Sequence, residues 1–243
     1  MMEKIVDILE AIAESKGVNS VSVLQKLTEI PRSTVHRTLQ NMERGGMVVY
    51  IPDKGYTISQ KLQYLCLTAN QNSDFLEVMI PYVKAISEET RETVSVNIIN
   101  DMQRLCIYSI YGSRHTVNNV RIGETGPLFI GATGKVLAAN IPDKEFQNAL
   151  RFAEEKGVIN DSNKTDLLSR IDECKKDGYS VSIEEKFRGC WSVSVPVVST
   201  ITKEFKGVLS INGVVTNYSE DIKNKYLKLL LDAAEEAGSK ILL

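Results

Sequence analysis

Apolar residues recur at helical spacing in three short segments near the start of the chain. In the first segment, four of them fall at positions i, i+3, i+4 and i+7 and so share one face of a helix: Ile5, Ile8, Leu9 and Ile12. Either Ser20 or Ser22 can cap a second, shorter helix. Leu24 and Leu27 of this second helix are expected to face inward, against the first.

A proline separates the second helix from the third. Pro31 cannot lie inside a helix without removing a hydrogen bond and crowding the preceding turn, so a tight break is expected there. The third helix should bury Val35, Leu39 and Met42 and end at Gly45-Gly46. Two strands follow, joined by Pro52-Asp53-Lys54-Gly55. This order predicts a winged helix-turn-helix, with the helix-turn-helix at about 20–44 and the wing at 47–59.

The other face of the third helix is polar and carries no acid before Glu43. Arg37 suits a guanine, and Gln40 or Asn41 suits an adenine. Ser33 and Thr34, at the start of the helix, suit a phosphate, as does Lys54 at the tip of the wing. The predicted DNA-contacting residues are Ser22, Arg32, Ser33, Thr34, His36, Arg37, Gln40 and Lys54. One such module binds weakly, so a dimer that contacts two half-sites is expected.

The rest of the chain mixes helical and strand patterns without regular βαβ alternation. A connecting helix at about 60–71 and a helix from Phe75 to Ile86, with Pro81 expected to kink it, come first. Strands are expected at 93–100, 104–111, 179–185, 191–199 and 205–212, and helices at 131–140, 142–155, 166–176 and from Ser219. These elements predict an α+β fold with a mainly antiparallel sheet. We expect a DNA-binding domain at 1–61 and a second domain at 62–243 that includes most of the linker helix.

Composition excludes several classes of protein. The 243 residues are 43% hydrophobic and 25% charged, which suits one or two globular domains. No apolar run could span a membrane, and the N-terminus does not resemble a secretory signal. The four cysteines, Cys66, Cys106, Cys174 and Cys190, are scattered, which favours free thiols in a reducing cytoplasm. With only two histidines, His36 and His115, a zinc site is not expected. Residues 1–62 hold eight basic and seven acidic residues, so charge alone does not separate DNA binding from protein binding.

Three segments carry a more specific pattern, in this order: IPRSTVHRTLQNMERGGMV, GETGPLFIGATGKVLAA and GYSVSIEEKFRGCWSVSVPV. Together they resemble the IclR family of bacterial and archaeal transcription regulators, and the resemblance runs nearly end to end. It implies a GAF-like effector domain with a small-molecule pocket. It also implies homodimers, often paired into tetramers, on palindromic promoter DNA.

The resemblance also implies where an effector would lie. Family effectors are frequently carboxylates or aromatic acids, and the helix that starts at the Gly131 turn offers backbone donors to an anion. Aligned on Gly189 and Pro196, the family's frequent pocket cysteine falls on Ser192 rather than Cys190. A common acidic position falls on Ser182, and the paired serines of the last strand become Ser210 and Asn212. The expected effector-binding residues are Gly131, Ala132, Thr133, Gly134, Ser182, Cys190, Ser192, Ser210 and Asn212.

No catalytic, metal or cofactor site emerges from the sequence. The stretch from Gly131 to Lys135 lacks the earlier glycine and the Ser/Thr of a phosphate-binding loop, which leaves Lys135 a solvent-facing or ion-paired residue. Glu184 and Glu185 are adjacent, so on a strand they would face opposite sides and could not act as an acid–base pair. Nothing places Cys190 beside His115, and Trp191 suits a core or interface better than a ligand site.

The sequence therefore predicts a cytoplasmic, ligand-responsive regulator that binds operator DNA, with repression favoured over activation. The alternative is a metabolite sensor or enzyme whose winged-helix head binds protein instead of DNA.

Overall fold

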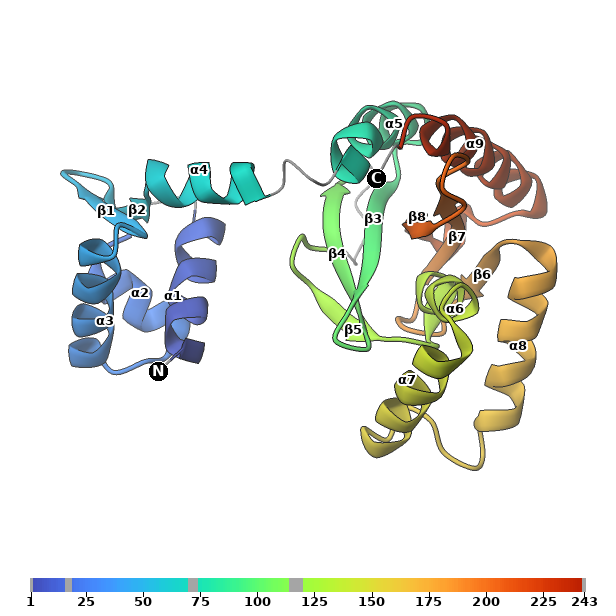
Figure 1. Cartoon of the computed structure of the whole chain (residues 1–243), viewed down its shortest axis with the longest axis horizontal. Helices are drawn as coiled ribbons and strands as arrows, with labels where there is room; N and C mark the ends of the chain where they lie inside the picture. The colour runs from blue at the N-terminus through green and yellow to red at the C-terminus, as the bar shows by residue number, and fades with distance from the viewer. Residues whose placement is uncertain (1, 16–18, 70–73, 114–119, 242–243) are drawn as a thin grey trace. The chain divides into compact units, whose positions relative to one another are not determined.

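The computed structural model describes residues 2–15, 19–69, 74–113 and 120–241. Its contacts divide the chain into two compact units, Met1–Asn72 and Ser73–Leu243. The elements of each unit are labelled in Figure 1.

The first unit consists of helices around a small core, followed by a hairpin and one further helix. Its elements are α1 (Met2–Glu14), α2 (Val21–Thr28), α3 (Arg32–Arg44), β1 (Val48–Ile51), β2 (Gly55–Ile58) and α4 (Gln60–Ala69). Ser20, rather than Ser22, caps α2, because its hydroxyl accepts a hydrogen bond from the Val23 N–H at 3.3 Å. The core residues come from α1, α2, the turn before α3, α3 itself and the hairpin: Ile8, Ile12, Leu24, Ile30, Val35, Leu39, Met42, Val48 and Tyr56.

Leu27 does not face inward as expected, since 57% of it is exposed. The helix ends one residue later, and Glu29 takes a left-handed conformation (φ 57°) that reverses the chain. Ile30, just beyond this turn, enters the core instead and is 7% exposed. The hydrophobic pattern therefore predicted the inward position of Leu24 correctly, but the prediction for Leu27 was wrong.

The wing is joined to the helices by backbone pairing. β1 and β2 are antiparallel, and Asn19 forms a parallel bridge with Gly55 at the start of β2. The Asn19 N–H donates to the Lys54 carbonyl and the Tyr56 N–H donates to the Asn19 carbonyl, both at 3.0 Å. The wing tip is therefore bonded to the segment that leads into α2.

The connecting helix α4 is anchored to the first unit. Ser59 accepts a hydrogen bond from the Leu62 N–H at 3.0 Å, and Lys61 donates to the Gly45 carbonyl at 3.2 Å. The compact units separate after α4, at Asn72 and Ser73, whereas the boundary expected between residues 61 and 62 falls in the first turn of this helix.

The second unit is built on one six-stranded antiparallel sheet, in the order β5-β4-β3-β8-β7-β6. Its helices are α5 (Asp74–Thr90), α6 (Gly131–Ala139), α7 (Asp143–Glu155), α8 (Lys164–Asp177) and α9 (Glu220–Gly238). The strands are β3 (Thr93–Asn100), β4 (Gln103–Ile110), β5 (Thr125–Pro127), β6 (Ser180–Ile183), β7 (Cys190–Val198) and β8 (Phe205–Val214). The predicted α+β class and mainly antiparallel sheet are confirmed; the short β5 was not expected.

Helices cover both faces of this sheet (Figure 1). α5 and α9 pack on one face, where the Trp191 ring stacks on Tyr226 with centroids 5.8 Å apart. α6 packs on the other face and against α8, over a second core that contains Phe129, Leu137 and Ile171. The N-terminus of α6 thus lies against the middle of the sheet. No helix among the described residues is long and apolar enough to cross a membrane.

Candidate functional site

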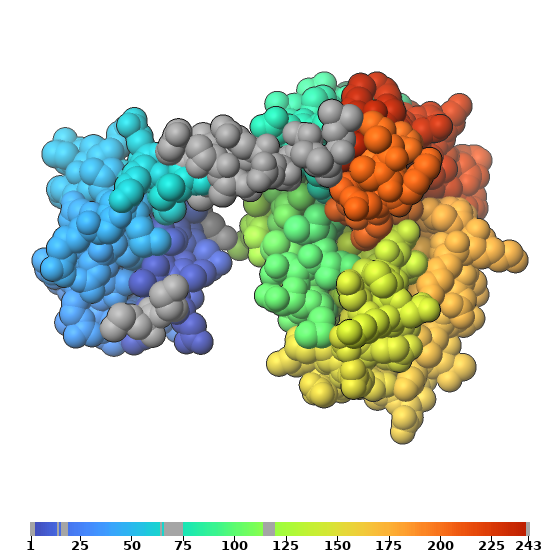
Figure 2. Space-filling view, in the orientation of Figure 1, coloured from blue at the N-terminus to red at the C-terminus, as the bar shows by residue number. Residues whose placement is uncertain are grey.

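The third helix presents its polar side to solvent. Val35, Leu39 and Met42 are buried as predicted, and the inward-facing Thr38 is buried with them. Arg32, Ser33, His36, Arg37 and Gln40 are exposed, and Thr34 is half-buried. Ser22 on α2 and Lys54 at the wing tip are also exposed. In the space-filling view this part of the chain lies at the surface of the first unit (Figure 2).

The two ends of α3 differ in their hydrogen bonding. Pro31 precedes the helix and offers no side-chain acceptor, while its carbonyl accepts from the Thr34 and Val35 N–H groups at 2.8 and 3.0 Å. Near the other end, the Arg44 guanidinium donates to the Asn41 side-chain oxygen. The amide oxygen of Asn41 is therefore used within the helix, and Gln40 is the better placed of the two amides for an outside partner.

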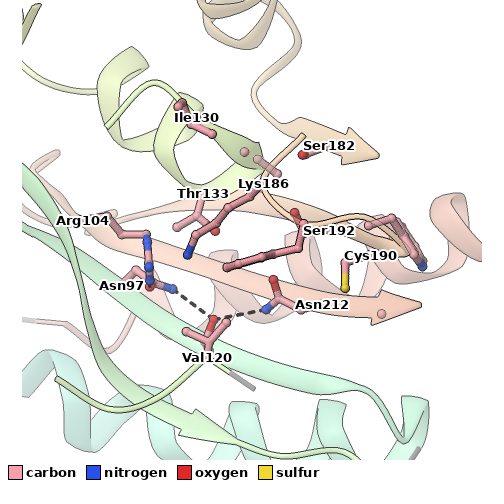
Figure 3. Close-up of a pocket in the computed structure, with 16 residues that line it drawn as sticks. Asn97, Arg104, Val120, Ile130, Thr133, Ser182, Lys186, Cys190, Ser192 and Asn212 are labelled. Carbon is pink, nitrogen blue, oxygen red and sulfur yellow. Dashed lines mark hydrogen bonds between the residues drawn. The ribbon is translucent and has the colours of Figure 1, made fainter. Parts of the chain in front are cut away.

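A pocket of about 650 Å³, including its open mouth, lies in the second unit between the sheet and the start of α6. Figure 3 shows its polar side chains converging from β3, β4, β7, β8 and α6. Residues expected from the sequence that line it are Gly131, Ala132, Thr133, Ser182, Cys190, Ser192 and Asn212. Cys190 and Ser192, two residues apart on β7, both reach the pocket.

Two expected pocket residues do not line it. Gly134 is buried in α6, where an added Cβ would lie 3.2 Å from the Phe129 nitrogen, so this glycine allows the helix to approach the preceding segment. The Ser210 hydroxyl is fully buried and bonds Thr133 at 2.9 Å and Ser194 at 2.8 Å. The sequence does not show that Gly134 is needed for close packing, or that the Ser210 hydroxyl bonds those of Thr133 and Ser194 instead of facing the pocket.

Several lining residues were missed by the sequence analysis: Ser95, Asn97, Arg104, Val120, Ile130, Lys186, Phe187 and Gly213. One available signal was the alternation in β3, where the polar Ser95 and Asn97 lie at every second position and alternate with the apolar Val94, Val96 and Ile98. Trp191 both packs in the core, at 2% exposure, and borders the pocket.

Two cations line the pocket, and one carboxylate beside it, that of Glu124, contacts both of them. Arg104 and Lys186 both contact Oε1 of Glu124, at 2.9 and 3.0 Å. Burial opposes ionisation of Glu124, but a hydrogen bond from the Arg121 N–H and the two cations outweigh it, and the pKa of this carboxyl lies below its usual value. Burial and the like charge of Arg104 together lower the pKa of Lys186, despite its bond to Glu124.

The start of α6 already holds a carboxylate from the protein itself. The Gly131 N–H donates to Oε2 of Glu185 at 3.0 Å, and Lys135 and Arg170 contact Oε1 at 2.6 and 2.9 Å. Lys135 is therefore ion-paired and 3% exposed, not solvent-facing. The Gly131 donor expected to serve an external anion is occupied in this structure.

Glu184 and Glu185 do not lie on a strand, contrary to the expectation. β6 ends at Ile183, and Glu184 takes a left-handed conformation (φ 57°), so the two carboxylates belong to a loop. Glu184 accepts a hydrogen bond from the Gly189 N–H at 2.6 Å, which closes that loop. Each carboxylate thus has a structural contact.

The thiols give no sign of a metal or disulfide site in the described part of the chain. Cys106, Cys174 and Cys190 are unbridged, and no group of three potential metal ligands comes together there. Burial raises the pKa of the Cys106 and Cys174 thiols to about 11. His115 and the side chain of Cys66 lie outside the described residues.

Comparison with known proteins agrees with both units. Residues 2–52 match the IclR helix-turn-helix domain, and residues 67–238 match the bacterial transcriptional regulator IclR C-terminal domain. The regulator KdgR of Dickeya chrysanthemi is 29% identical over 98% of this chain and 78% of its own length. The transcriptional repressor IclR of Escherichia coli is 23% identical over 94% of this chain and 85% of its own.

Solved structures share the fold. The IclR of Thermotoga maritima has a TM-score of 0.75 at 24% identity, covering 98% of this chain and 97% of its own. An IclR homologue from Microbacterium hydrocarbonoxydans, complexed with 4-hydroxybenzoate, has a TM-score of 0.76 at 16% identity and the same coverage. The family resemblance expected from the sequence is confirmed, and these relatives are regulators rather than enzymes. From its two matched domains, the chain belongs to the IclR family of transcriptional regulators.

Proposed function

We propose that this regulator is a repressor that binds palindromic operator DNA as a dimer or a pair of dimers. A small organic acid held in the pocket of the second unit changes that binding. The observation that carries the proposal is the free polar face of α3, which projects two arginines, a histidine and a glutamine from a helix anchored by Val35, Leu39 and Met42. The repressor named among its relatives supports the direction of control.

The DNA contacts follow from where each side chain lies. Arg37 and Gln40 are one turn apart on the exposed face of α3, so they can reach neighbouring base edges in the major groove. Arg32, Ser33 and Thr34 lie in the first turn, beside backbone N–H groups that suit a phosphate. Ser22, His36 and Lys54 complete the proposed contact surface, with Lys54 on the phosphate backbone.

The effector site is proposed from the pocket that Thr133, Ser182, Cys190, Ser192 and Asn212 line. The 4-hydroxybenzoate complex of a protein with this fold supports a small acid as the class of ligand. Coupling between the sites requires the acid to favour one arrangement of the DNA-binding heads, typically by about 1–3 kcal/mol. We further propose that the protein acts in the cytoplasm, where operator DNA is found.

A gel shift with the DNA upstream of the protein's own gene tests DNA binding. We expect Arg37→Ala to weaken specific binding by about 1–3 kcal/mol, or roughly tenfold to a hundredfold, because a base contact is lost. Lys228→Ala, at an exposed position on α9, is the matched control because it removes the same charge from the other unit. Equal affinity of the Arg37→Ala variant and the control would contradict the assignment. Retention without sequence dependence would favour a head that binds protein.

A further inference from the structure

Two cations of the pocket share a single carboxylate oxygen. Arg104 and Lys186 reach Oε1 of Glu124 from different elements, β4 and the loop between β6 and β7. The Arg104 side chain is 7% exposed, and those of Lys186 and Glu124 are 33% and 30% exposed. The cluster therefore carries one net positive charge at the pocket wall, and water screens the buried Arg104 less than a surface cation.

Arg104 is held in place by a chain of hydrogen bonds along the pocket floor. Its NH1 donates to Oδ1 of Asn97 at 2.9 Å, and the Asn97 amide donates to the Ser95 hydroxyl at 3.1 Å. The Asn212 amide donates to the same hydroxyl at 3.5 Å; these amide bonds are the dashed lines in Figure 3. This floor fixes the guanidinium before any ligand arrives, which reduces the entropy lost on binding.

Glu124 itself sits on a short surface turn. Its N–H donates to the Arg121 carbonyl at 3.0 Å, and its Oε2 accepts from the Arg121 N–H at 3.1 Å. Gly123 in this turn has no heavy atom within 4 Å of where a Cβ would lie. The Glu124 side chain is itself 30% exposed, so its carboxylate can turn toward solvent.

We propose that Arg104 and Lys186 form the carboxylate subsite of the effector, and that Glu124 occupies this subsite until an acid displaces it. The inference rests on the proposed function, since it concerns the same pocket. Next to the subsite, Thr133, Ser192 and Asn212 offer hydroxyl and amide groups. The effector class is accordingly a small acid that carries further hydroxyl or carbonyl oxygens.

Displacement would also reach the neighbouring loop. Lys186 is bonded to Glu124, and the adjacent Glu185 is bonded to the start of α6 through Gly131 and to its first turns through Lys135. An acid that replaces Glu124 takes over the bond to Lys186 and releases the Glu124 carboxylate. The turn itself stays on β4, because the Gly123 N–H donates to the Cys106 carbonyl at 2.8 Å and the Cys106 N–H donates to the Glu124 carbonyl at 3.0 Å. The Glu124 carboxylate then has two positions, bound to the cations or displaced from them, and the ligand favours the displaced one.

Chemical rescue tests the subsite without knowledge of the natural effector. Thermal unfolding of the full chain is measured at neutral pH in sodium acetate and in sodium chloride at equal concentration. We expect Glu124→Ala to melt at lower temperature in chloride, because two cations lose their counter-ion, and to regain about 2 °C or more in acetate. Wild-type protein should melt at nearly the same temperature in both salts, since its subsite is filled.

Matched variants separate this site from general anion effects. Glu154→Ala breaks the surface ion pair with Lys164 and should show no gain specific to acetate. Adding Lys186→Gln to Glu124→Ala should abolish the rescue. If Glu124→Ala does not fold, Glu124→Ser also leaves the space of the carboxylate open and serves for the same comparison.

Equal melting of the Glu124 variant in acetate and chloride would overturn the proposal, as would a gain in acetate that wild-type protein and Glu154→Ala show equally. The measurement involves no DNA. A failed gel shift would therefore count against the proposed function alone, and a failed rescue against the subsite alone.

Discussion

Gly55 occupies a position at which a side chain cannot be added without moving backbone. Its φ is +72°, and a Cβ would lie 2.5 Å from the Asn19 carbonyl oxygen. We expect Gly55→Ala to lower the free energy of unfolding by about 1–3 kcal/mol, from backbone strain and from loss of the bridge to Asn19. Denaturant unfolding followed by circular dichroism measures the change.

Gly46→Ala is the matched control in the same unit. Gly46 also has φ +72°, but its Cβ would meet only the flexible end of Lys61, at 2.9 Å. The Gly55 variant should therefore be the less stable of the two. If the two variants lose the same free energy of unfolding, the close contact between the new Cβ and Asn19 does not contribute to the loss.

Glu124 makes part of the stability depend on pH. Burial opposes its ionisation, but the Arg121 N–H, Lys186 and Arg104 outweigh burial and keep its pKa below the unfolded value of 4.5. Because the folded state favours the ionised form, this contribution is complete above pH 4.5 and is lost as the pH falls through the lower folded value.

We therefore compare the melting temperature at about pH 3 with that at about pH 6. The difference between the two should be smaller for Glu124→Gln than for wild type. Glu155→Gln, at an exposed position of α7, removes the same charge and should leave the wild-type difference in place. An unchanged difference in the Glu124 variant would contradict this account of its pKa.

At the scale of elements, Lys135 joins α6 to the strand and loop beside it. Its ammonium contacts Glu185 at 2.6 Å and donates to the Val181 carbonyl at 3.2 Å. Glu185 would keep Arg170 and the Gly131 N–H in Lys135→Met, so we expect a loss of about 1–3 kcal/mol rather than the full cost of an unpaired buried charge. Urea unfolding checks this value.

Lys164→Met serves as the control for that variant. Lys164 pairs with Glu154 at 2.7 Å, but its side chain is 42% exposed and water screens the pair, so its loss should lower the free energy of unfolding much less than the loss of Lys135. If both variants lose the same free energy of unfolding, burial of the ion pair between Lys135 and Glu185 does not add to stability.

Element type and order were largely predictable, because they depend on local periodicity. Leu24, Val35 and Leu39 are buried where the helical spacing placed them. The pocket was predicted through the family resemblance, which located the start of α6 and β7. Its charged residues were not, because the Arg104–Glu124 and Lys186–Glu124 bonds join residues 20 and 62 positions apart. No local pattern contains such pairings, and none could show that Ser210 is enclosed by Thr133 and Ser194.

At the scale of the whole molecule, the proposed dimer should bind DNA only when both half-sites face the same side of the duplex. Inserting about 5 base pairs between the half-sites rotates one of them by roughly half a turn. We expect affinity to fall at least about tenfold, which corresponds to roughly 1.4 kcal/mol. Fluorescence anisotropy with labelled operator DNA measures the change.

An insertion of about 10 base pairs restores the facing of the half-sites and provides the control for spacing alone. If the 5-base-pair insertion leaves the affinity unchanged, each head binds its half-site independently.

The backbone bridge between Asn19 and Gly55 has a consequence for how the proposed repression would be relieved. With the wing tip bonded to the entrance of α2, the hairpin cannot swing separately from the helices. In the proposed dimer, a metabolite would therefore act by changing the distance or angle between two heads, each of which moves as a unit. Loss of repression would then be a failure of spacing, in which each head still fits its own half of the operator.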